Sequence, residues 1–324
     1  MGTYTRVGLA GAGVTCGLLL LALSVGHNGD DESAASTQPK NAAAAPPKGP
    51  YVALGDSYTS GPRIPAPTGT PAGCDRSDRN YPALVAQELE IKAADFRDVS
   101  CSGATLADLS APQTTGDGVN PAQLSALSAS TRLVTIGIGG NDIGFGSLVE
   151  SCVKQGALYV ATGSGKYTGD DAPCRSRYVS DSDSGATDEV RQRIEAAGER
   201  LADTLQEVER RAPQAQVYVV GYPAILPAKG AGCDDDMTLA PDDATYLDDK
   251  ERQLNKVLRE RAASAGAGYV DTYTPSAGRD ACSARETRWV EPLIPANAAA
   301  PVHPNERGER GMADAVLRTL KASR

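Results

Sequence analysis

The chain has 324 residues, of which 23% are charged and 40% hydrophobic, and its formal net charge at pH 7 is −9. This acidic balance argues against nucleic acid as a partner. It also disfavours adhesion to anionic lipid through charge, so any transient contact with a lipid surface has to be apolar.

The first 26 residues have the pattern of an export signal. Arg6 is followed by an apolar run over residues 7–25 that no acidic residue interrupts. An uncleaved membrane anchor is the alternative, because a run of about 19 residues is just long enough to span a bilayer. Residues 27–49 are polar and then Ala- and Pro-rich, which is typical of a disordered linker. The sequence therefore predicts a secreted protein, or a membrane-anchored one if the signal is retained, with a single folded domain over residues 50–324.

Apolar patterns alternate along this domain between strand-like and helix-like segments. Strands are expected at 51–54, 96–99, 132–138, 216–221 and 267–270. Helices are expected at 81–91, 188–211, 243–265 and 305–321, the last capped by Asn305. Such alternation predicts an α/β fold with a mainly parallel sheet covered on both faces. The Gly-, Ser- and Asp-rich stretch 146–187 is interpreted as a stapled surface excursion, a candidate lid or rim.

Seven cysteines occur in the chain, and Cys16 lies in the predicted signal. The others form an even set in the predicted domain: Cys74, Cys101, Cys152, Cys174, Cys233 and Cys282. Disulfides are therefore expected, although sequence alone leaves many pairings open; sequential pairing would close loops of modest length. Because no pair has Cys-x-x-Cys spacing and His303 is the only histidine after the linker, we expect neither a metal site nor a cofactor.

Polar motifs follow three of the predicted strands. They are Gly55-Asp56-Ser57, Ser102-Gly103-Ala104 and Gly139-Gly140-Asn141-Asp142. Each alone is compatible with an ordinary turn. Because catalytic groups gather at the carboxyl ends of the strands in parallel α/β folds, we expect the three motifs to converge.

A serine becomes a nucleophile only beside a base that accepts its proton near neutral pH, and imidazole has a suitable pKa. His303 is the only histidine of the predicted domain, so Ser57 and His303 form the predicted catalytic pair. The backbone N–H groups of Ser57 and Gly103 and the side-chain amide of Asn141 are candidate donors to an oxyanion.

Taken together, these motifs resemble the SGNH hydrolases, also called the GDSL esterase and lipase superfamily, over nearly all of residues 50–324. The resemblance implies a nucleophile at Ser57, a base at His303 and oxyanion donors at Ser57, Gly103 and Asn141. It also implies a three-layer α/β/α flavodoxin-like fold with a mainly parallel five-stranded sheet, and carboxylic-ester substrates. The chain is most similar to the extracellular bacterial branch with three disulfides, which implies the pairs Cys74–Cys101, Cys152–Cys174 and Cys233–Cys282.

The chain departs from the family pattern at one position. Members with a full triad carry Asp three residues before the histidine, whereas this chain has Ala300. The same branch includes members in which a main-chain carbonyl replaces the carboxylate, so the resemblance implies that the carbonyl of Ala300 or Pro301 orients His303. Asp142 or another acid is the alternative. A neutral carbonyl stabilises the imidazolium less than a carboxylate, which predicts a Ser-His dyad with a lowered imidazole pKa.

The sequence thus predicts a secreted serine carboxylic-ester hydrolase, a lipase or esterase that acts as a monomer on small-molecule or lipid esters through an acyl-enzyme on Ser57. The alternatives are a phospholipase A-type enzyme, a carbohydrate acetylesterase, and a non-catalytic surface-binding protein on the same scaffold. Trp289 is expected to be a packing residue, and the alternative is an acyl-binding wall with Phe145 opposite. Tyr58, next to the nucleophile, is open to both interpretations.

Overall fold

The computed structural model describes residues 47, 49–162, 171–180, 187–228 and 233–322. The predicted signal at 1–26 and all of the predicted linker except residues 47 and 49 lie outside these residues. Residues 163–170 and 181–186 of the predicted excursion lie outside them as well. Within the described ranges no helix is both long and apolar enough to cross a bilayer.

Five strands form one parallel sheet in the order β2-β1-β5-β8-β9. Their bounds are β1 (Tyr51–Gly55), β2 (Phe96–Asp98), β5 (Leu133–Gly137), β8 (Gln216–Val220) and β9 (Gly268–Val270). Counted along the chain, this is the 2-1-3-4-5 order of flavodoxin-like folds. The prediction of a parallel five-stranded α/β fold is therefore confirmed.

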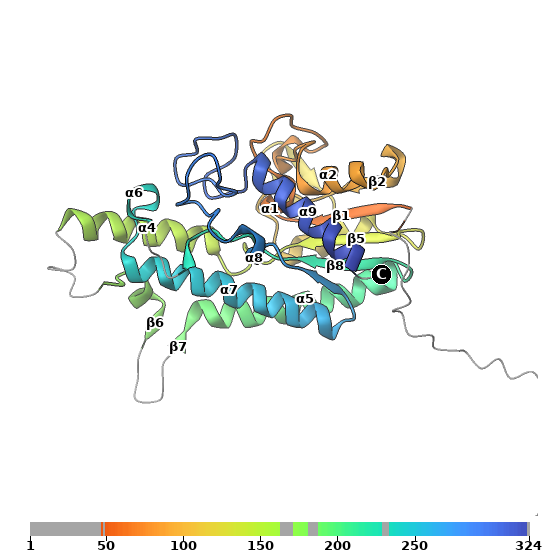
Figure 1. Ribbon diagram of the computed structural model, residues 1–324. Helices are drawn as coiled ribbons and strands as arrows, with labels where there is room; N and C mark the ends of the chain where they lie inside the picture. The colour runs from red at the N-terminus through yellow and green to blue at the C-terminus, as the bar shows by residue number, and fades with distance from the viewer. Residues whose placement is uncertain (1–46, 48, 163–170, 181–186, 229–232, 323–324) are drawn as a thin grey trace, which may run out of the picture. The chain divides into compact units, whose positions relative to one another are not determined.

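Helices cover both faces of the sheet (Figure 1). α2 (Tyr81–Glu88) and α9 (Glu306–Ala322) pack on one face, and α5 (Glu189–Arg211) and α7 (Pro241–Ser264) pack on the other. β1 shows why two cores form, since Tyr51 and Ala53 join the core under α2 and α9 while Val52 and Leu54 join the core under α5 and α7. Successive strand residues point to opposite faces, so one apolar run supplies both layers.

The remaining elements lie at the carboxyl ends of the strands and on the surface. The helices are α1 (Ser57–Ser60), α3 (Leu106–Ser110), α4 (Phe145–Ala161), α6 (Asp234–Met237) and α8 (Tyr273–Ser276). Single 3₁₀ turns occur at η1 (Ala72–Cys74), η2 (Ala93–Asp95), η3 (Gln123–Ala126) and η4 (Arg175–Arg177). Two small antiparallel hairpins join β3 (Gln113–Thr115) to β4 (Gly118–Asn120) and β6 (Val179–Ser180) to β7 (Thr187–Asp188).

The long predicted helices are present with small shifts at their ends. The one expected at 81–91 stops at Glu88, and Glu90 beyond it has φ of +54°, a left-handed conformation that ends a helix. The one expected at 305–321 begins at Glu306 because Asn305 is its cap, with Oδ1 accepting from the N–H groups of Arg307 and Gly308 at 3.0 Å each.

The stretch 146–187, interpreted as a stapled surface excursion, is bridged by the Cys152–Cys174 disulfide, and it begins with a helix that the sequence did not lead us to expect. Residues 145–161 form the 17-residue helix α4. Its buried face carries Leu148, Val149, Cys152, Gly156 and Tyr159, which recur at helical spacing. The Gly and Ser content of the whole stretch obscured this pattern.

Three disulfides tie the loops to the sheet and helices. They join Cys74 to Cys101, Cys152 to Cys174 and Cys233 to Cys282. These are the pairs that the family resemblance implies. The first bond lies directly before the Ser102-Gly103 turn, so it holds that turn against the loop that contains η1.

Candidate active site

The three sequence motifs and the histidine loop surround one cavity of about 450 Å³. Strands β1 and β5 pair in register from Tyr51 with Leu133 to Gly55 with Gly137, so the motifs that follow them leave the sheet side by side. Ser57, Gly103, Asn141 and His303 all line the cavity. Residues far apart in the sequence therefore meet at the carboxyl ends of the strands, as the parallel fold requires.

Ser57 is the first residue of α1 and is held by the residues just before it. A Cβ at Gly55 would lie 2.2 Å from Thr59 Oγ1 and 2.5 Å from Gly137 O, so only glycine allows this sharp exit from β1. Asp56 caps the helix, and its Oδ1 accepts from the Tyr58 N–H at 2.9 Å. The Ser57 hydroxyl consequently stands at the helix start, where the positive end of the helix dipole lies.

His303 contacts both the serine and a backbone carbonyl. Its Nε2 lies 2.8 Å from Ser57 Oγ, and its Nδ1 lies 2.7 Å from Pro301 O. A carbonyl oxygen can only accept, so Nδ1 carries the proton and Nε2 keeps the lone pair that can take the serine proton. The tautomer required of a general base is thus fixed without a carboxylate.

The loop that carries His303 is fixed on two sides. Val302 has φ of +58°, an uncommon left-handed conformation for a β-branched residue, and this lets the imidazole fold back on Pro301. The Tyr58 hydroxyl donates to Val302 O at 2.6 Å, and the Tyr58 ring lies 4.9 Å from the His303 ring. The next carbonyl, that of His303, accepts from Glu291 N at 3.0 Å. Tyr58 is therefore a positioning residue for the base.

Burial lowers the pKa of His303 below its ordinary value of 6.5, the hydrogen bond to Pro301 O opposes this shift, and the charge of Arg63 adds to it. The imidazole is consequently neutral at neutral pH. A neutral ring is the form that can accept the proton of Ser57.

Hydrogen-bond donors converge on the other side of the serine. Among the described residues the N–H groups of Ser57 and Gly103 have no acceptor, and Gly103 has φ of +78°, which favours glycine. Asn141 donates one amide hydrogen to Ala104 O at 2.9 Å, which fixes its side chain and leaves the second amide hydrogen for the cavity. This set can hold a developing oxyanion.

Asp142 does not contact the histidine, so it does not replace the missing triad carboxylate. Its Oδ2 accepts from Leu106 N at 3.0 Å, and its Oδ1 lies 3.4 Å from Arg200 Nε. These contacts join the Asn141 turn to α3 and α5. The acid therefore positions the asparagine turn.

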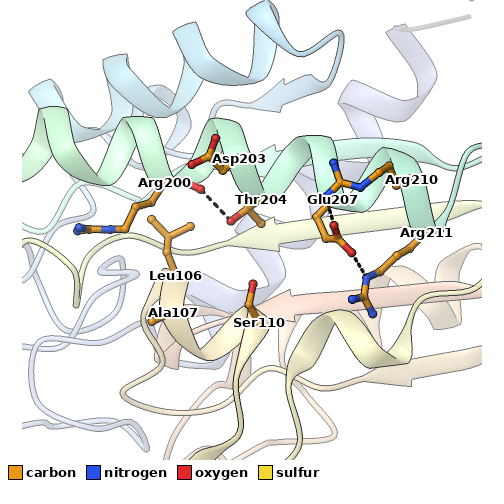
Figure 2. Close-up of a pocket in the computed structure, with 9 residues that line it drawn as sticks. All are labelled: Leu106, Ala107, Ser110, Arg200, Asp203, Thr204, Glu207, Arg210 and Arg211. Atoms are coloured by element: carbon orange, nitrogen blue, oxygen red, sulfur yellow. Dashed lines mark hydrogen bonds and ion pairs between the residues drawn. The ribbon is translucent and has the colours of Figure 1, made fainter.

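Arg200 also lines a second, charged groove between α3 and α5 (Figure 2). Glu207 in this groove pairs with Arg210 and Arg211, and Arg200 points away from that cluster toward Asp142. The three arginines of the groove thus each pair with an acidic side chain of the same chain. Nowhere in the described ranges do three His, Cys, Asp or Glu side chains gather as ligands for a metal ion.

Comparison with known proteins identifies the family. The model of the GDSL-like lipase/acylhydrolase family matches residues 53–310, which is most of the chain. The chain belongs to this family. It is accordingly a carboxylic-ester hydrolase of the GDSL type.

The chain is similar to several enzymes of Streptomyces. It is 39% identical to Lipase 2 of Streptomyces coelicolor over 280 residues, 86% of this chain and 88% of that protein. Among solved structures it is similar to phospholipase A1 of Streptomyces albidoflavus, with 28% identity and a TM-score of 0.66 over 84% of this chain and 100% of that one. The extracellular lipase of Streptomyces rimosus is 27% identical, with a TM-score of 0.65 over 84% and 99%.

Apolar side chains form part of the wall of the active-site cavity beside Ser57 and His303. Phe145, Val149 and Val153 project from successive turns of α4, and they face into the same cavity as Ile225, Leu254 and Leu293. The spacing of the first three residues was a signal of helix that the sequence reasoning missed. Trp289 does not line this cavity; it is 7% exposed, and a Cβ at Gly311 would lie 2.2 Å from its ring. Trp289 is thus a packing residue, whereas Phe145 lies in the wall.

Two buried residues of the cavity lining, Tyr222 and Glu251, were also missed by the sequence reasoning. Tyr222, which follows β8, donates its hydroxyl hydrogen to Asp56 Oδ2 at 2.5 Å, and the Tyr222 hydroxyl oxygen accepts from Gly140 N at 2.7 Å. This chain of bonds links the serine turn to the asparagine turn. Burial raises the pKa of Asp56 to about 7, against the lowering effect of the bonds from Tyr222 and the Tyr58 N–H. The position of Tyr222 at the carboxyl end of a strand was the available clue.

Besides Asp56 and Glu150, the cavity wall holds a third carboxyl group, the buried one of Glu251. It is 2% exposed, its Oε2 accepts from Ile225 N at 3.0 Å, and burial raises its pKa well above the ordinary 4.5. Burial thus favours the neutral form of this carboxyl group, which suits an apolar chain beside it.

Proposed function

We propose that the Ser57-His303 dyad hydrolyses carboxylic esters through an acyl-enzyme. Ser57 Oγ attacks the ester carbonyl while His303 Nε2 takes the hydroxyl proton. The N–H groups of Ser57 and Gly103 and the amide of Asn141 bind the oxyanion. The tetrahedral intermediate then collapses, and the leaving alcohol takes the proton from Nε2.

Deacylation repeats these steps with water. His303 Nε2 removes a proton from the water that attacks the acyl carbonyl, and it returns this proton to Ser57 Oγ when the acid leaves. Pro301 O keeps the Nδ1 hydrogen in place throughout. The observation that carries the proposal is the pair of contacts made by one imidazole, 2.8 Å to Ser57 Oγ and 2.7 Å to Pro301 O.

We further propose that the substrate is an ester with an acyl chain longer than acetyl. The walls formed by Phe145, Val149 and Val153 with Leu254 would bury a chain of several methylenes. Each buried methylene is worth about 0.8 kcal/mol, and an acetyl group would leave most of this surface unused. A carbohydrate acetylesterase is therefore the weaker candidate.

A phospholipase A-type activity is the second candidate. The similarity to phospholipase A1 of Streptomyces albidoflavus, at a TM-score of 0.66, favours it. A glycerophospholipid presents the same acyl ester and differs only in the alcohol part, which would leave through the open side of the cavity. Both candidates use the same dyad.

We also propose that the protein is secreted and acts as a monomer. The three disulfides and the similarity to an extracellular lipase support secretion, because such bonds persist in oxidising compartments. Removal of the predicted signal at residues 1–26 is part of this proposal. N-terminal sequencing of the protein from culture medium tests it.

The substrate proposal is tested with p-nitrophenyl esters of acetate and octanoate. The wild type is expected to show kcat/KM for octanoate at least about 10-fold above that for acetate, because the longer chain fills the apolar walls. Ser57→Ala is expected to lose hydrolysis of both esters, and thermal melting checks that it is folded. Equal rates for Ser57→Ala and the wild type would refute the enzyme mechanism. A preference for acetate would refute only the acyl-chain proposal.

A further inference from the structure

One loop beside the cavity has no charged residue and carries a highly exposed isoleucine. Residues 292–302 read Pro-Leu-Ile-Pro-Ala-Asn-Ala-Ala-Ala-Pro-Val, without one charged residue in a chain that is 23% charged. Ile294 is 85% exposed, the highest value among the exposed large hydrophobic side chains that the structure describes. We call residues 292–302 the Ile294 loop. A single exposed apolar residue is ordinary; Ile294 differs because its neighbour Leu293 lines the active-site cavity.

The buried side chain of Glu291 holds the Ile294 loop in one conformation. The carboxylate of Glu291 is fully buried, and its Oε2 accepts from the N–H groups of Ala296 at 2.8 Å and Asn297 at 3.0 Å. Its Oε1 accepts from the side-chain amides of Asn297 at 2.7 Å and Asn305 at 2.6 Å. These hydrogen bonds fix the turn that follows Ile294, so the exposed isoleucine lies on an ordered loop.

The same loop is continuous with the acyl cavity. Leu293 lines the cavity directly next to the exposed Ile294. Pro292 O accepts from Val302 N at 3.3 Å, which ties the two ends of the loop together next to His303. A surface that covers Ile294 would therefore lie at the mouth of the cavity.

A second uncharged segment adjoins the loop. Residues 64–71 read Ile-Pro-Ala-Pro-Thr-Gly-Thr-Pro, and most of them are exposed. Ala300 N donates to Pro62 O at 3.0 Å, so this segment starts beside the Ile294 loop. Since the whole chain carries a net charge of −9, an anionic lipid surface would be repelled, while a neutral or zwitterionic one would not.

We propose that the Ile294 loop docks on the surface of neutral or zwitterionic lipid and so brings its esters to the cavity mouth. This inference rests on the proposed function for its biological purpose. The contact with lipid itself requires only the exposed side chain of Ile294 and the turn that Glu291 fixes. Burial of a fully exposed isoleucine in an apolar phase is large enough to shift partition by about 10- to 100-fold.

The proposal is tested by flotation with phosphatidylcholine vesicles in a Ser57→Ala background, so that hydrolysis does not alter the lipid. Ile294→Asp is expected to lower partition to the vesicles by about 10- to 100-fold, and Ile294→Trp is expected to keep or raise it. Val119→Asp is the matched control, because Val119 is 56% exposed on β4 and does not line the cavity. It is expected to leave partition unchanged.

In the catalytically intact protein, Ile294→Asp is expected to lower the ratio of activity on vesicle-bound ester to activity on dissolved short ester by about 10-fold. Unchanged flotation of Ile294→Asp, an equal loss in Val119→Asp, or stronger binding to phosphatidylglycerol vesicles would overturn the docking proposal. A dimer that Ile294→Asp dissociates, with no vesicle binding, would show that a second copy covers the loop instead. If the wild type hydrolyses no ester, the proposed function fails while flotation still decides the docking.

Discussion

Replacing His303 with glutamine is expected to lower kcat/KM for ester hydrolysis by about 10⁵-fold or more. Glutamine keeps the size and polarity of the side chain but cannot take a proton from Ser57. In the described cavity no other imidazole stands within reach of that hydroxyl, whose contact with Nε2 is 2.8 Å. Steady-state hydrolysis of p-nitrophenyl octanoate measures the loss.

The control for this prediction is the double variant with Ser57→Ala. Because the two residues act as a unit, the double variant is expected to be no slower than either single variant. Thermal melting of all three should match the wild type within a few degrees. Retention of more than about 1% of kcat/KM in His303→Gln would contradict the role of the histidine as general base.

Asn141→Ala is expected to lower kcat by about 10²- to 10³-fold with little change in KM, because an oxyanion donor acts mainly in the transition state. The bond of its amide to Ala104 O, at 2.9 Å, aims the side chain before substrate arrives. Measurement of kcat and KM on the octanoate ester separates this effect from weakened binding.

Asn120→Ala provides a matched control. Asn120 is 2% exposed and also donates its amide to a backbone carbonyl, Val99 O at 3.2 Å, but it does not line the cavity. It is expected to lose stability with kcat nearly unchanged. If both variants lost the same fraction of kcat, or if Asn141→Ala raised KM alone, the donor role of Asn141 would be refuted.

The sheet could be predicted from sequence because each buried strand is a short apolar run that ends in glycine or a polar turn. β1 and β5 illustrate this, since Gly55 and Gly137 end runs of fully buried residues at paired positions. A parallel arrangement then forces the following motifs to one edge of the sheet. The apolar pattern and the parallel topology together were enough to predict that Ser57 and Asn141 lie close to each other.

Other parts of the site depend on information that local pattern does not carry. The bond of Tyr222 to Asp56 joins residues that are 166 positions apart, and it exists only because of the register of β8 against β5. The choice of Pro301 over Ala300 as the carbonyl that holds His303 depends on the left-handed φ of Val302. The helix α4 was missed because its stripe of Phe145, Val149 and Val153 lies beside a Gly- and Ser-rich stretch.

In the proposed mechanism a backbone carbonyl, and no carboxylate, orients the catalytic base. This arrangement is tested most directly by the pH dependence of kcat/KM for the wild type, Ala300→Asp and Ala298→Asp. Activity requires neutral imidazole, so the lowered pKa of His303 places the acidic limb of the wild type below pH 6.5. A carboxylate at position 300 would favour the imidazolium, raise this pKa and move the limb to higher pH by about one unit or more.

Ala298→Asp adds the same charge at an exposed neighbouring position, so it is expected to move the limb much less. We expect a wild-type midpoint below pH 6.5 and a shift to higher pH that is specific to Ala300→Asp. A wild-type midpoint above 6.5, or an equal response of the two variants, would contradict a base that a carbonyl orients.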